Sequence, residues 1–321
     1  MTPSPERAPA HTDSAYGGAG WRPRTASTRD ELGTLWSRCG INSEWAPLRA
    51  VLLHRPGPEL GASADWDAVN MLAPLDLRRA QEQHDRLAQA YHDAGVAVAY
   101  LDPPERPAPN QMFMADLFFM TPEGAILARP ASAVRAGEER AAARRLVELG
   151  VPILRSVSGH GTFEGADAMW LDPQTVLVGR GLRTNDAGTA QLRAILGEQG
   201  VEVIQVDLPY GTMHLMGMLR IVDRDLAIAW PTRLAVRAVE ALRARGYQVI
   251  FLPDLQEALS GAAMNSVTLG PRHILMPAGN PATQAFYERH GITCVTVPLD
   301  ELAKAAGAAG CLTGILQREL I

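Results

Sequence analysis

The chain has 321 residues, 47% of them hydrophobic, so it is long enough to bury a large core as one large domain or two ordinary ones. Its net charge of -5 and the lack of a run rich in lysine and arginine argue against a nucleic-acid partner, because no basic surface is available for a phosphate backbone. The three cysteines, Cys39, Cys294 and Cys311, are widely spaced and indicate neither a disulfide framework nor a zinc cluster, so a reducing cytoplasm fits best.

The chain begins with a segment of different composition. Residues 1–30 are rich in Pro, Ala, Gly, Ser and Thr, and they lack the apolar stretch of a secretory signal. We therefore expect a flexible tail over residues 1–33 and a single catalytic domain over residues 34–321. No window approaches the roughly 18 consecutive apolar residues that a membrane span needs, so no membrane association is expected.

After this segment, a unit of roughly 50 residues recurs along the chain. Each unit starts with two apolar strands around a tight polar turn, which predicts a β-hairpin; the hairpins are expected at 117–130, 168–181, 218–231 and 265–279. An amphipathic helical pattern follows each hairpin, at 134–149, 187–199, 232–245 and 283–290. A short apolar strand ends each unit, at 151–155, 201–206, 247–252 and 292–297.

A fifth unit can be assembled from the two ends of the chain. Residues 311–320 would pair beside 48–56, followed by a helix over 77–94 and a strand over 96–101. This closure leaves no sheet edge exposed, so we predict an α/β fold, a five-bladed α/β propeller of ββαβ-type units with pseudo-fivefold symmetry. The alternative is a doubly wound sheet, which the antiparallel hairpins and the absence of a Gly-x-Gly-x-x-Gly turn disfavour.

Reactive side chains gather just before the first strand of each hairpin, about one repeat apart. They are Asp116, Glu164 with Asp167, His214, Asn265 and Cys311. Equivalent positions of a closed ring face the same axis, so these side chains should meet. A pair of carboxylates can hold a planar cation through paired hydrogen bonds, and a guanidinium group is its natural ligand. Cys311 would attack the central carbon as a thiolate, with His214 as acid and base.

The chain resembles the guanidine-modifying superfamily of arginine deiminase, dimethylarginine dimethylaminohydrolase and the amidinotransferases, over about residues 42–320. EWAPLRAVLLHRPG is similar to the opening strand of that superfamily. PNQMFMAD resembles its Asn-x-x-Phe-x-Arg-Asp pattern, FEGAD its Phe-Glu-Gly-Gly-Asp pattern, and TMHL and Cys-Leu-Thr its histidine and terminal cysteine motifs.

The resemblance implies a role for each matching residue. The catalytic residues would be Cys311, His214 and Glu164. The substrate-binding residues would be Asp116 at the guanidinium, Asn110 at the α-amino end, Arg183 and Arg135 at the carboxylate, Phe113 elsewhere along the substrate, and Asp167 in support. The implied route runs through a covalent S-alkylthiouronium intermediate that water hydrolyses, and it needs no metal or other cofactor.

Three departures from the superfamily pattern bear on the substrate. Ala115 stands where an arginine usually precedes the first aspartate, and the Gly-Gly-rich sequence before the cysteine is reduced to AAGAAG. Met216 stands where arginine deiminases and amidinotransferases carry an aspartate that grips the guanidinium. A flexible apolar side chain should tolerate a substituted nitrogen, so we expect Met216 in the substrate pocket and a hydrolase of N-substituted arginine.

Other functions stay open at this stage. An amidinotransferase would use the same residues but pass the amidino group to an amine, and an arginine deiminase or dihydrolase would act on plain arginine. A non-catalytic binding protein on the same fold is a further alternative. The expected partner is a small guanidino molecule, and the oligomeric state, a homo-oligomer included, is open.

Overall fold

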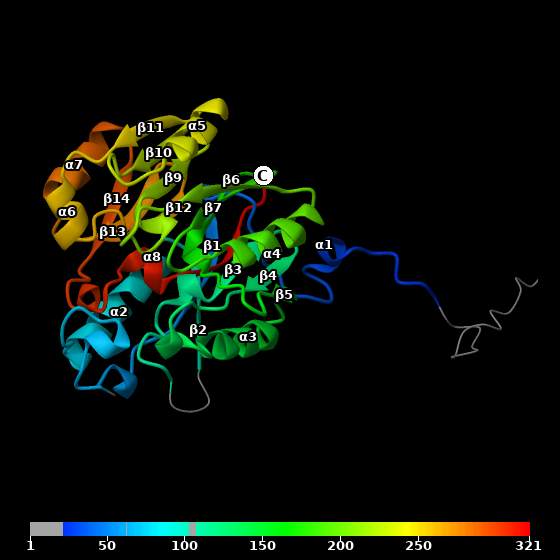
Figure 1. The fold of residues 1–321 in the computed structure, drawn as a ribbon, viewed down its shortest axis with the longest axis horizontal. Coiled ribbons are helices and arrows are strands. Elements are labelled where there is room, and N and C mark those ends of the chain that lie inside the picture. Colours follow the sequence, from blue (N-terminus) through cyan, green and yellow to red (C-terminus); the bar gives the residue numbers. More distant parts are fainter. Residues whose placement is uncertain (1–21, 62, 103–106) are drawn as a thin grey trace, which may run out of the picture.

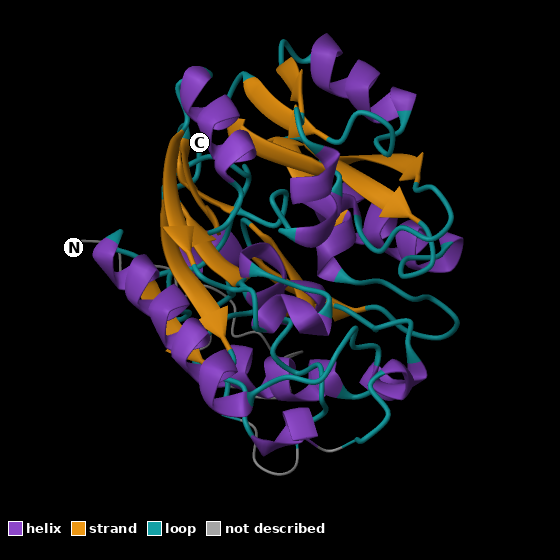
Figure 2. Ribbon diagram, turned by 90° about the vertical axis from the view of Figure 1, so that its left-hand side faces the viewer, coloured by secondary structure: helices purple, strands orange, loops and turns teal. Residues whose placement is uncertain are grey.

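The computed structural model describes residues 22–61, 63–102 and 107–321. Their strands form five three-stranded sheets of mixed α/β architecture (Figure 1). The strand orders are β15-β1-β2, β3-β4-β5, β6-β7-β8, β9-β10-β11 and β12-β13-β14. Figure 2, turned by a quarter rotation, shows the larger helices on the outside of the sheets. None of the helices in these ranges is both long and apolar enough to cross a membrane.

The sheet β3-β4-β5 shows the plan that the others share. β3 (Phe118–Thr121) and β4 (Gly124–Leu127) form an antiparallel hairpin, α3 (Glu138–Glu148) crosses over, and β5 (Ile153–Ser156) pairs parallel to β4. Gly124 permits the tight turn because its φ is +143° and a Cβ there would lie 2.4 Å from the carbonyl oxygen of Pro152. Only glycine fits such a backbone without strain.

The next three sheets repeat this order of strand, strand, helix and strand. Their elements are β6 (Ala168–Asp172), β7 (Thr175–Arg180), α4 (Asp186–Gly197) and β8 (Glu202–Asp207); β9 (Leu219–Asp223), β10 (Leu226–Ala229), α5 (Val236–Ala244) and β11 (Gln248–Phe251); β12 (Val267–Gly270), β13 (His273–Pro277), α7 (Pro281–Arg289) and β14 (Thr293–Val297). The predicted hairpins and crossover helices are confirmed, with ends moved by a few residues. The short helix α6 (Leu255–Ser260) was not predicted.

The fifth sheet joins the two ends of the chain, as predicted. β15 (Gly314–Arg318) pairs antiparallel with β1 (Leu48–Leu53), and β2 (Ala97–Tyr100) pairs parallel with β1 after helix α2 (Leu77–Asp93). The doubly wound alternative is excluded, since every sheet in the described ranges combines an antiparallel and a parallel neighbour. Most of the predicted tail lies outside these ranges; at its end the structure has the four-residue helix α1 (Thr28–Glu31).

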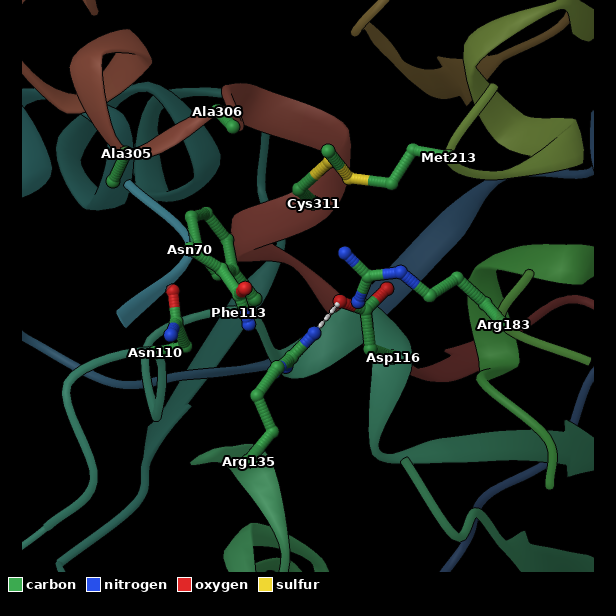
Figure 3. Close-up of a pocket in the computed structure, with 10 residues that line it drawn as sticks. All are labelled: Asn70, Asn110, Phe113, Asp116, Arg135, Arg183, Met213, Ala305, Ala306 and Cys311. Carbon is green, nitrogen blue, oxygen red and sulfur yellow. Dashed lines mark hydrogen bonds and ion pairs between the residues drawn. The ribbon is translucent and has the colours of Figure 1, made fainter. Parts of the chain in front are cut away.

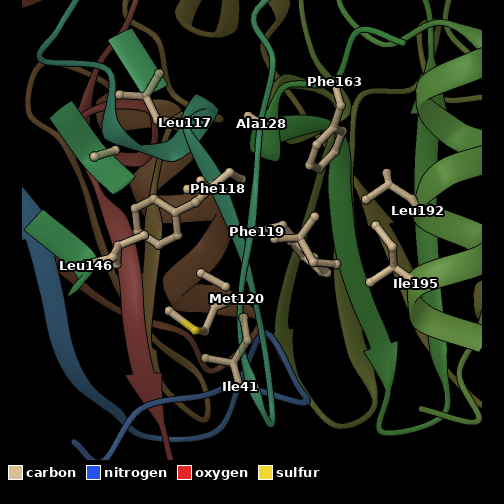
Figure 4. Packing of buried hydrophobic residues seen from close by; sticks show 14 of the residues in the cluster. Ile41, Leu117, Phe118, Phe119, Met120, Ala128, Leu146, Phe163, Leu192 and Ile195 are labelled. Carbon is tan, nitrogen blue, oxygen red and sulfur yellow. The ribbon is translucent and has the colours of Figure 1, made fainter. Parts of the chain in front are cut away.

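The strands nearest the site are buried on both faces. Phe118 and Phe119 of β3 point to opposite sides of the strand (Figure 4), which explains why the hairpin reads as a continuous apolar run. Phe119 stacks on Trp170 of the next sheet, with ring centroids 5.8 Å apart. The Trp170 indole N–H also donates to the carbonyl oxygen of Met120 at 3.1 Å, so apolar packing and a buried hydrogen bond join the two sheets.

Candidate active site

In four of the five sheets, the reactive residues lie in, or directly before, a short helical turn that leads into a strand. The turns are η3 (Met114–Asp116), η5 (Gly165–Asp167), η6 (Leu215–Gly217) and α8 (Ala309–Leu312). The strand predicted to open at Cys311 therefore begins only at Gly314, because residues 309–312 turn instead. Turns η3 and η5 are in direct contact: a Cβ on Gly165 would lie 2.3 Å and 2.5 Å from the carbonyl oxygens of Phe118 and Ala115.

These turns bring two acids and a histidine together. His214 Nε2 is hydrogen-bonded to Glu164 Oε2 at 2.6 Å and lies 3.8 Å from Asp116 Oδ1. All three side chains are buried. Asp116 Oδ1 has no hydrogen-bond partner among the described residues, so a strong acceptor is left open in the middle of the cluster.

Cys311 lies at the same site, and Asn265 holds it. Cys311 and Asp116 line one pocket (Figure 3). The backbone N–H of Cys311 donates to Asn265 Oδ1 at 3.0 Å, and Asn265 Nδ2 donates to the Cys311 sulfur at 2.9 Å. The sequence placed Asn265 at the equivalent position of its unit but predicted no role for it. The structure makes it the side chain that orients the sulfur.

The two arginines expected at a substrate carboxylate contact the acids instead. Arg135 Nη1 donates to Asp116 Oδ2 at 2.6 Å, and Arg183 Nη1 lies 3.3 Å from both carboxylate oxygens of Glu164. Figure 3 shows the bond between Arg135 and Asp116 as a dashed line, with Arg183 entering the pocket from another element. The Arg135 side chain is 4% exposed and that of Arg183 is 18% exposed, so only Arg183 has a surface open to a ligand.

Glu138, which the sequence analysis missed, explains where Arg135 points. Its Oε2 accepts from both Nε and Nη2 of Arg135, at 3.0 Å and 2.8 Å. Arg135 lies in the turn η4 (Ala133–Arg135), and α3 begins at Glu138, so the predicted helix over 134–149 starts later than expected. An acid three residues after an arginine at a helix start was the available signal in the sequence.

Three further predicted residues either support the site or line its pocket. Asp167 accepts from the backbone N–H of Leu215 at 3.0 Å and from the Thr184 hydroxyl at 2.7 Å, so it anchors the turn that carries His214. Asn110 lines the pocket, but its Nδ2 donates to the carbonyl oxygen of Val69 at 2.7 Å. Phe113 lines it too and lies beneath Arg135, 5.8 Å from the guanidinium carbon to the ring centroid.

Met216 does not lie where the sequence analysis expected it. It lines a separate cavity of about 40 Å³ together with Arg220, Gly310 and Arg318. Met216 does not line the pocket shared by Asp116 and Cys311, so its effect on a substituted nitrogen stays a prediction.

Two cavities reach the reactive residues. The pocket shared by Asp116 and Cys311 measures about 20 Å³, little more than the space of one water molecule. A cavity of about 440 Å³ opens beside it and is lined by His214, Asn265, Trp230 and Arg233, among others. Met213 lines both cavities, so it lies at the boundary between them.

The electrostatics favour an ion pair between His214 and Glu164. Burial disfavours the His214 cation, but Asp116, the hydrogen bond to Glu164 and Asp167 outweigh it and raise its pKa to about 9. Burial also disfavours the Glu164 anion, but the bond to His214 and the charges of Arg135 and Arg183 lower its pKa to about 2. Burial and Asp116 raise the pKa of Cys311, while Asn265 and Arg220 oppose that rise.

The same cluster offers a donor set for a metal ion, with one ligand atom each from Asp116, Glu164 and His214 within 4.8 Å of one another. A guanidinium already fills that role, since Arg135 Nη1 lies 2.6 Å from Asp116 and 3.6 Å from Glu164. The cluster thus has its positive charge from the chain itself.

Comparison with known proteins identifies the family of the chain. A family model described as N,N dimethylarginine dimethylhydrolase, eukaryotic, matches residues 73–317. The chain belongs to this family. The predicted membership of the guanidine-modifying superfamily is thereby confirmed.

Individual relatives extend the family match. The N(G),N(G)-dimethylarginine dimethylaminohydrolase of Streptomyces coelicolor is 29% identical over 274 residues, which cover 85% of this chain and 99% of that protein. The structure of a DDAH variant from Pseudomonas aeruginosa with citrulline has a TM-score of 0.71 at 23% identity, covering 85% of this chain and 100% of that one. An amidinotransferase from Microseira wollei has a TM-score of 0.72 at 14% identity, covering 88% and 97%. The two structural matches show a shared fold.

Proposed function

We propose that this family member is a cysteine-dependent hydrolase of the guanidino group of arginine or an N-substituted arginine. One observation carries the proposal: the carboxylate of Asp116 already binds a guanidinium, that of Arg135, through Oδ2, while its other oxygen faces the site without a partner. A substrate guanidinium can donate to this free oxygen while Arg135 keeps its bond to Oδ2, provided that the pocket of about 20 Å³ widens to admit it. Cys311 lines the same pocket, and His214 lies beside it.

The mechanism follows from these positions. The Cys311 thiolate attacks the central guanidinium carbon, and the positive charge of the substrate favours both the thiolate and the attack. His214, cationic at neutral pH, gives its proton to the departing amine, which leaves a covalent S-alkylthiouronium. His214, now neutral, takes a proton from water as the water attacks the same carbon. The carbon–sulfur bond then breaks to release a ureido product and the thiolate.

Amidino transfer is the second candidate, and the cavity of about 440 Å³ is the observation that favours it. This space reaches His214 and is large enough for an amine acceptor beside the first pocket. Arg233 lies on its wall with the guanidinium carbon 4.3 Å from the Trp230 ring centroid, where it could contact an anionic acceptor. A transferase would exchange water for an amine at the second step and keep every other residue in its role.

We also infer that the five sheets are the blades of a ring with pseudo-fivefold symmetry. Contacts between consecutive sheets support this arrangement. β15 contacts β3, β1 contacts β12, and β12 contacts β9. The Trp170 bond to Met120 and a bond from the Tyr247 hydroxyl to the carbonyl oxygen of Leu171, at 2.5 Å, join the remaining neighbours. A ring explains why residues one repeat apart reach one site.

Product analysis tests the proposed function. The protein would be incubated with arginine and with N-methylated arginines, with and without glycine as an amine acceptor. Mass spectrometry should find a ureido product and a free amine, independent of acceptor. Cys311→Ser should lower the rate by at least about a thousandfold, with an unchanged melting temperature.

Other outcomes would reject the proposal. Transfer of the amidino group to glycine would establish the transferase. Binding of guanidines without turnover, together with an ordinary Cys311 reactivity, would identify a binding protein.

A further inference from the structure

A second set of buried charges lies next to the nucleophile, outside the site described above. The cavity of about 40 Å³ that contains Met216 is also lined by Glu44, Arg220 and Arg318. It touches the turn α8 from another side, because Gly310 lines this cavity whereas Cys311 lines the substrate pocket. The mechanism proposed above uses none of these three charged residues.

Arg220 is in contact with the turn that carries Cys311. It belongs to β9, is 7% exposed, and donates from Nε to the carbonyl oxygen of Met264 at 2.9 Å. A Cβ on Gly310 would lie 2.3 Å from Arg220 Nη2, so this nitrogen touches the backbone of the residue before Cys311. The same Nη2 has no hydrogen-bond partner among the described residues.

The charges around this cavity do not balance. Arg220 and Arg318 are both buried, and no carboxylate in the described ranges lies within ion-pair distance of either one. Burial lowers the pKa of Arg318 to about 10, so it remains a cation at neutral pH. Glu44, whose Oε1 accepts from the backbone N–H of Trp170, supplies at most one negative charge. One positive charge is left over.

The groups on the other side of Cys311 have partners of their own, and none of them pairs with Arg220. There, Asp116, Glu138 and Glu164 pair with Arg135, Arg183 and the cationic His214. Asp167 accepts from the Thr184 hydroxyl and from the backbone N–H of Leu215. The tyrosines that face Arg220, Tyr91 and Tyr287, have pKa values raised by burial and are neutral at neutral pH. An unpaired buried cation is costly, and a Cys311 thiolate would neutralise it.

We propose that Arg220 is a positioning residue whose unpaired guanidinium supplies the counter-charge for the Cys311 thiolate. Arg220 contacts Gly310, so its positive charge lies on the side of α8 that faces away from the substrate pocket. The Arg220 guanidinium and the cationic substrate can therefore both stabilise the thiolate. Asn265 orients the sulfur and Arg220 sets its charge. The proposal rests on the proposed function only in taking Cys311 as the nucleophile.

The pH dependence of Cys311 alkylation by iodoacetamide tests this role without substrate. The measurement uses the full chain with Cys39→Ser and Cys294→Ser, so that Cys311 is the only thiol left to be alkylated. Arg220→Met should raise the apparent pKa of Cys311 and lower its alkylation rate at neutral pH by about tenfold or more, since one pKa unit is a factor of ten. Arg220→Lys should restore part of the rate.

Glu44→Gln provides an opposite prediction in a variant that should fold. The glutamine oxygen can still accept from the N–H of Trp170, but the negative charge near Arg220 is gone. The pKa of Cys311 should therefore fall and its alkylation should speed up. Arg245→Met is the matched control, because Arg245 pairs with Asp172 outside this cavity; its alkylation profile should not change.

Two results would overturn the role of Arg220: an unchanged profile in a folded Arg220→Met variant, or a slower Cys311 in Glu44→Gln. If Arg220→Met does not fold, Glu44→Gln decides the matter alone. Failure of the proposed function is a separate outcome, since it would show as absent turnover of guanidines by a protein whose alkylation profile still shifts as predicted.

Discussion

Arg135 is the side chain on which the geometry of the acidic site depends most. It is buried, and its guanidinium contacts Asp116 and Glu138 directly and lies 3.6 Å from Glu164. Burial alone would lower its pKa, but the three carboxylates raise it above its ordinary value, so it is always charged. It thereby fixes one oxygen of Asp116 and leaves the other for a ligand.

Removal of Arg135 should therefore be costly. Arg135→Met leaves Asp116 and Glu138 buried without their shared cation, so the free energy of unfolding should fall by about 3–5 kcal/mol. Chemical denaturation at neutral pH measures the change. The double variant Arg135→Met with Glu138→Leu should recover part of it, because one of the two uncompensated charges is gone. Equal losses in the single and double variants would contradict this account.

The pKa of His214 sets an upper pH limit for the reaction. Because it is raised to about 9, the proton for the leaving amine is available at neutral pH, and kcat/KM should fall as pH rises above about 9. Asp167→Asn removes one of the charges that raise this pKa and should move the limit to lower pH. Rate profiles measured with the same substrate check both statements; an unchanged limit in Asp167→Asn would refute the second.

The same shift predicts how stability depends on pH. The folded pKa of His214 lies above its ordinary value of 6.5, so its contribution to stability is complete below about 6.5 and is lost as pH rises through about 9. Glu164 behaves oppositely: its contribution is present above 4.5 and is lost as pH falls toward about 2.

Among the secondary-structure elements, the turns before the strands place the chemistry. Turns η3 and η5 touch through Gly165, where any side chain would meet the carbonyl oxygens of Phe118 and Ala115. This contact keeps Asp116, at the end of η3, close to Glu164, just before η5. The acidic pair is thus a consequence of two turns that pack without side chains between them.

Gly165→Ala tests this contact. The added methyl group must push the turns apart, so we expect a loss of about 1–3 kcal/mol in stability together with a larger loss in kcat/KM. Gly197→Ala, in α4, is the matched control because nothing lies within 4 Å of its new methyl group, and it should be neutral or stabilising. A Gly165→Ala protein with full activity would show that the spacing of the turns does not matter.

Over the whole molecule, stability depends on how neighbouring sheets are joined. Trp170 joins two of them by stacking on Phe119 and by donating to the carbonyl oxygen of Met120. No such link is visible in the binary pattern of the strands, which only requires apolar residues on both faces.

Trp170→Phe separates the two contributions. Phenylalanine keeps most of the apolar contact but leaves the buried Met120 carbonyl without its donor, so unfolding should become easier by about 1–3 kcal/mol. Thermal or urea unfolding measures the change, and Trp170→Ala should cost more because it also leaves a cavity. A Trp170→Phe protein as stable as the parent would assign the link to stacking alone.

The local elements and the identity of the reactive residues could be predicted from the sequence. Hairpin turns, strand runs and crossover helices depend on nearby residues, and the repeat placed Asp116, Glu164, His214, Asn265 and Cys311 at equivalent positions. The superfamily motifs depend on the same short segments.

Only the tertiary structure decided which charged and polar side chains contact one another. Some of these contacts join residues that are distant in sequence, as in the pairing of Arg135 with Asp116 and of Asn265 with Cys311. Others depend on the direction in which a turn points its side chains, as in the placement of Met216 with Arg220 around a separate cavity. Side-chain direction in a short turn is set by packing from other sheets, and no local pattern contains that information.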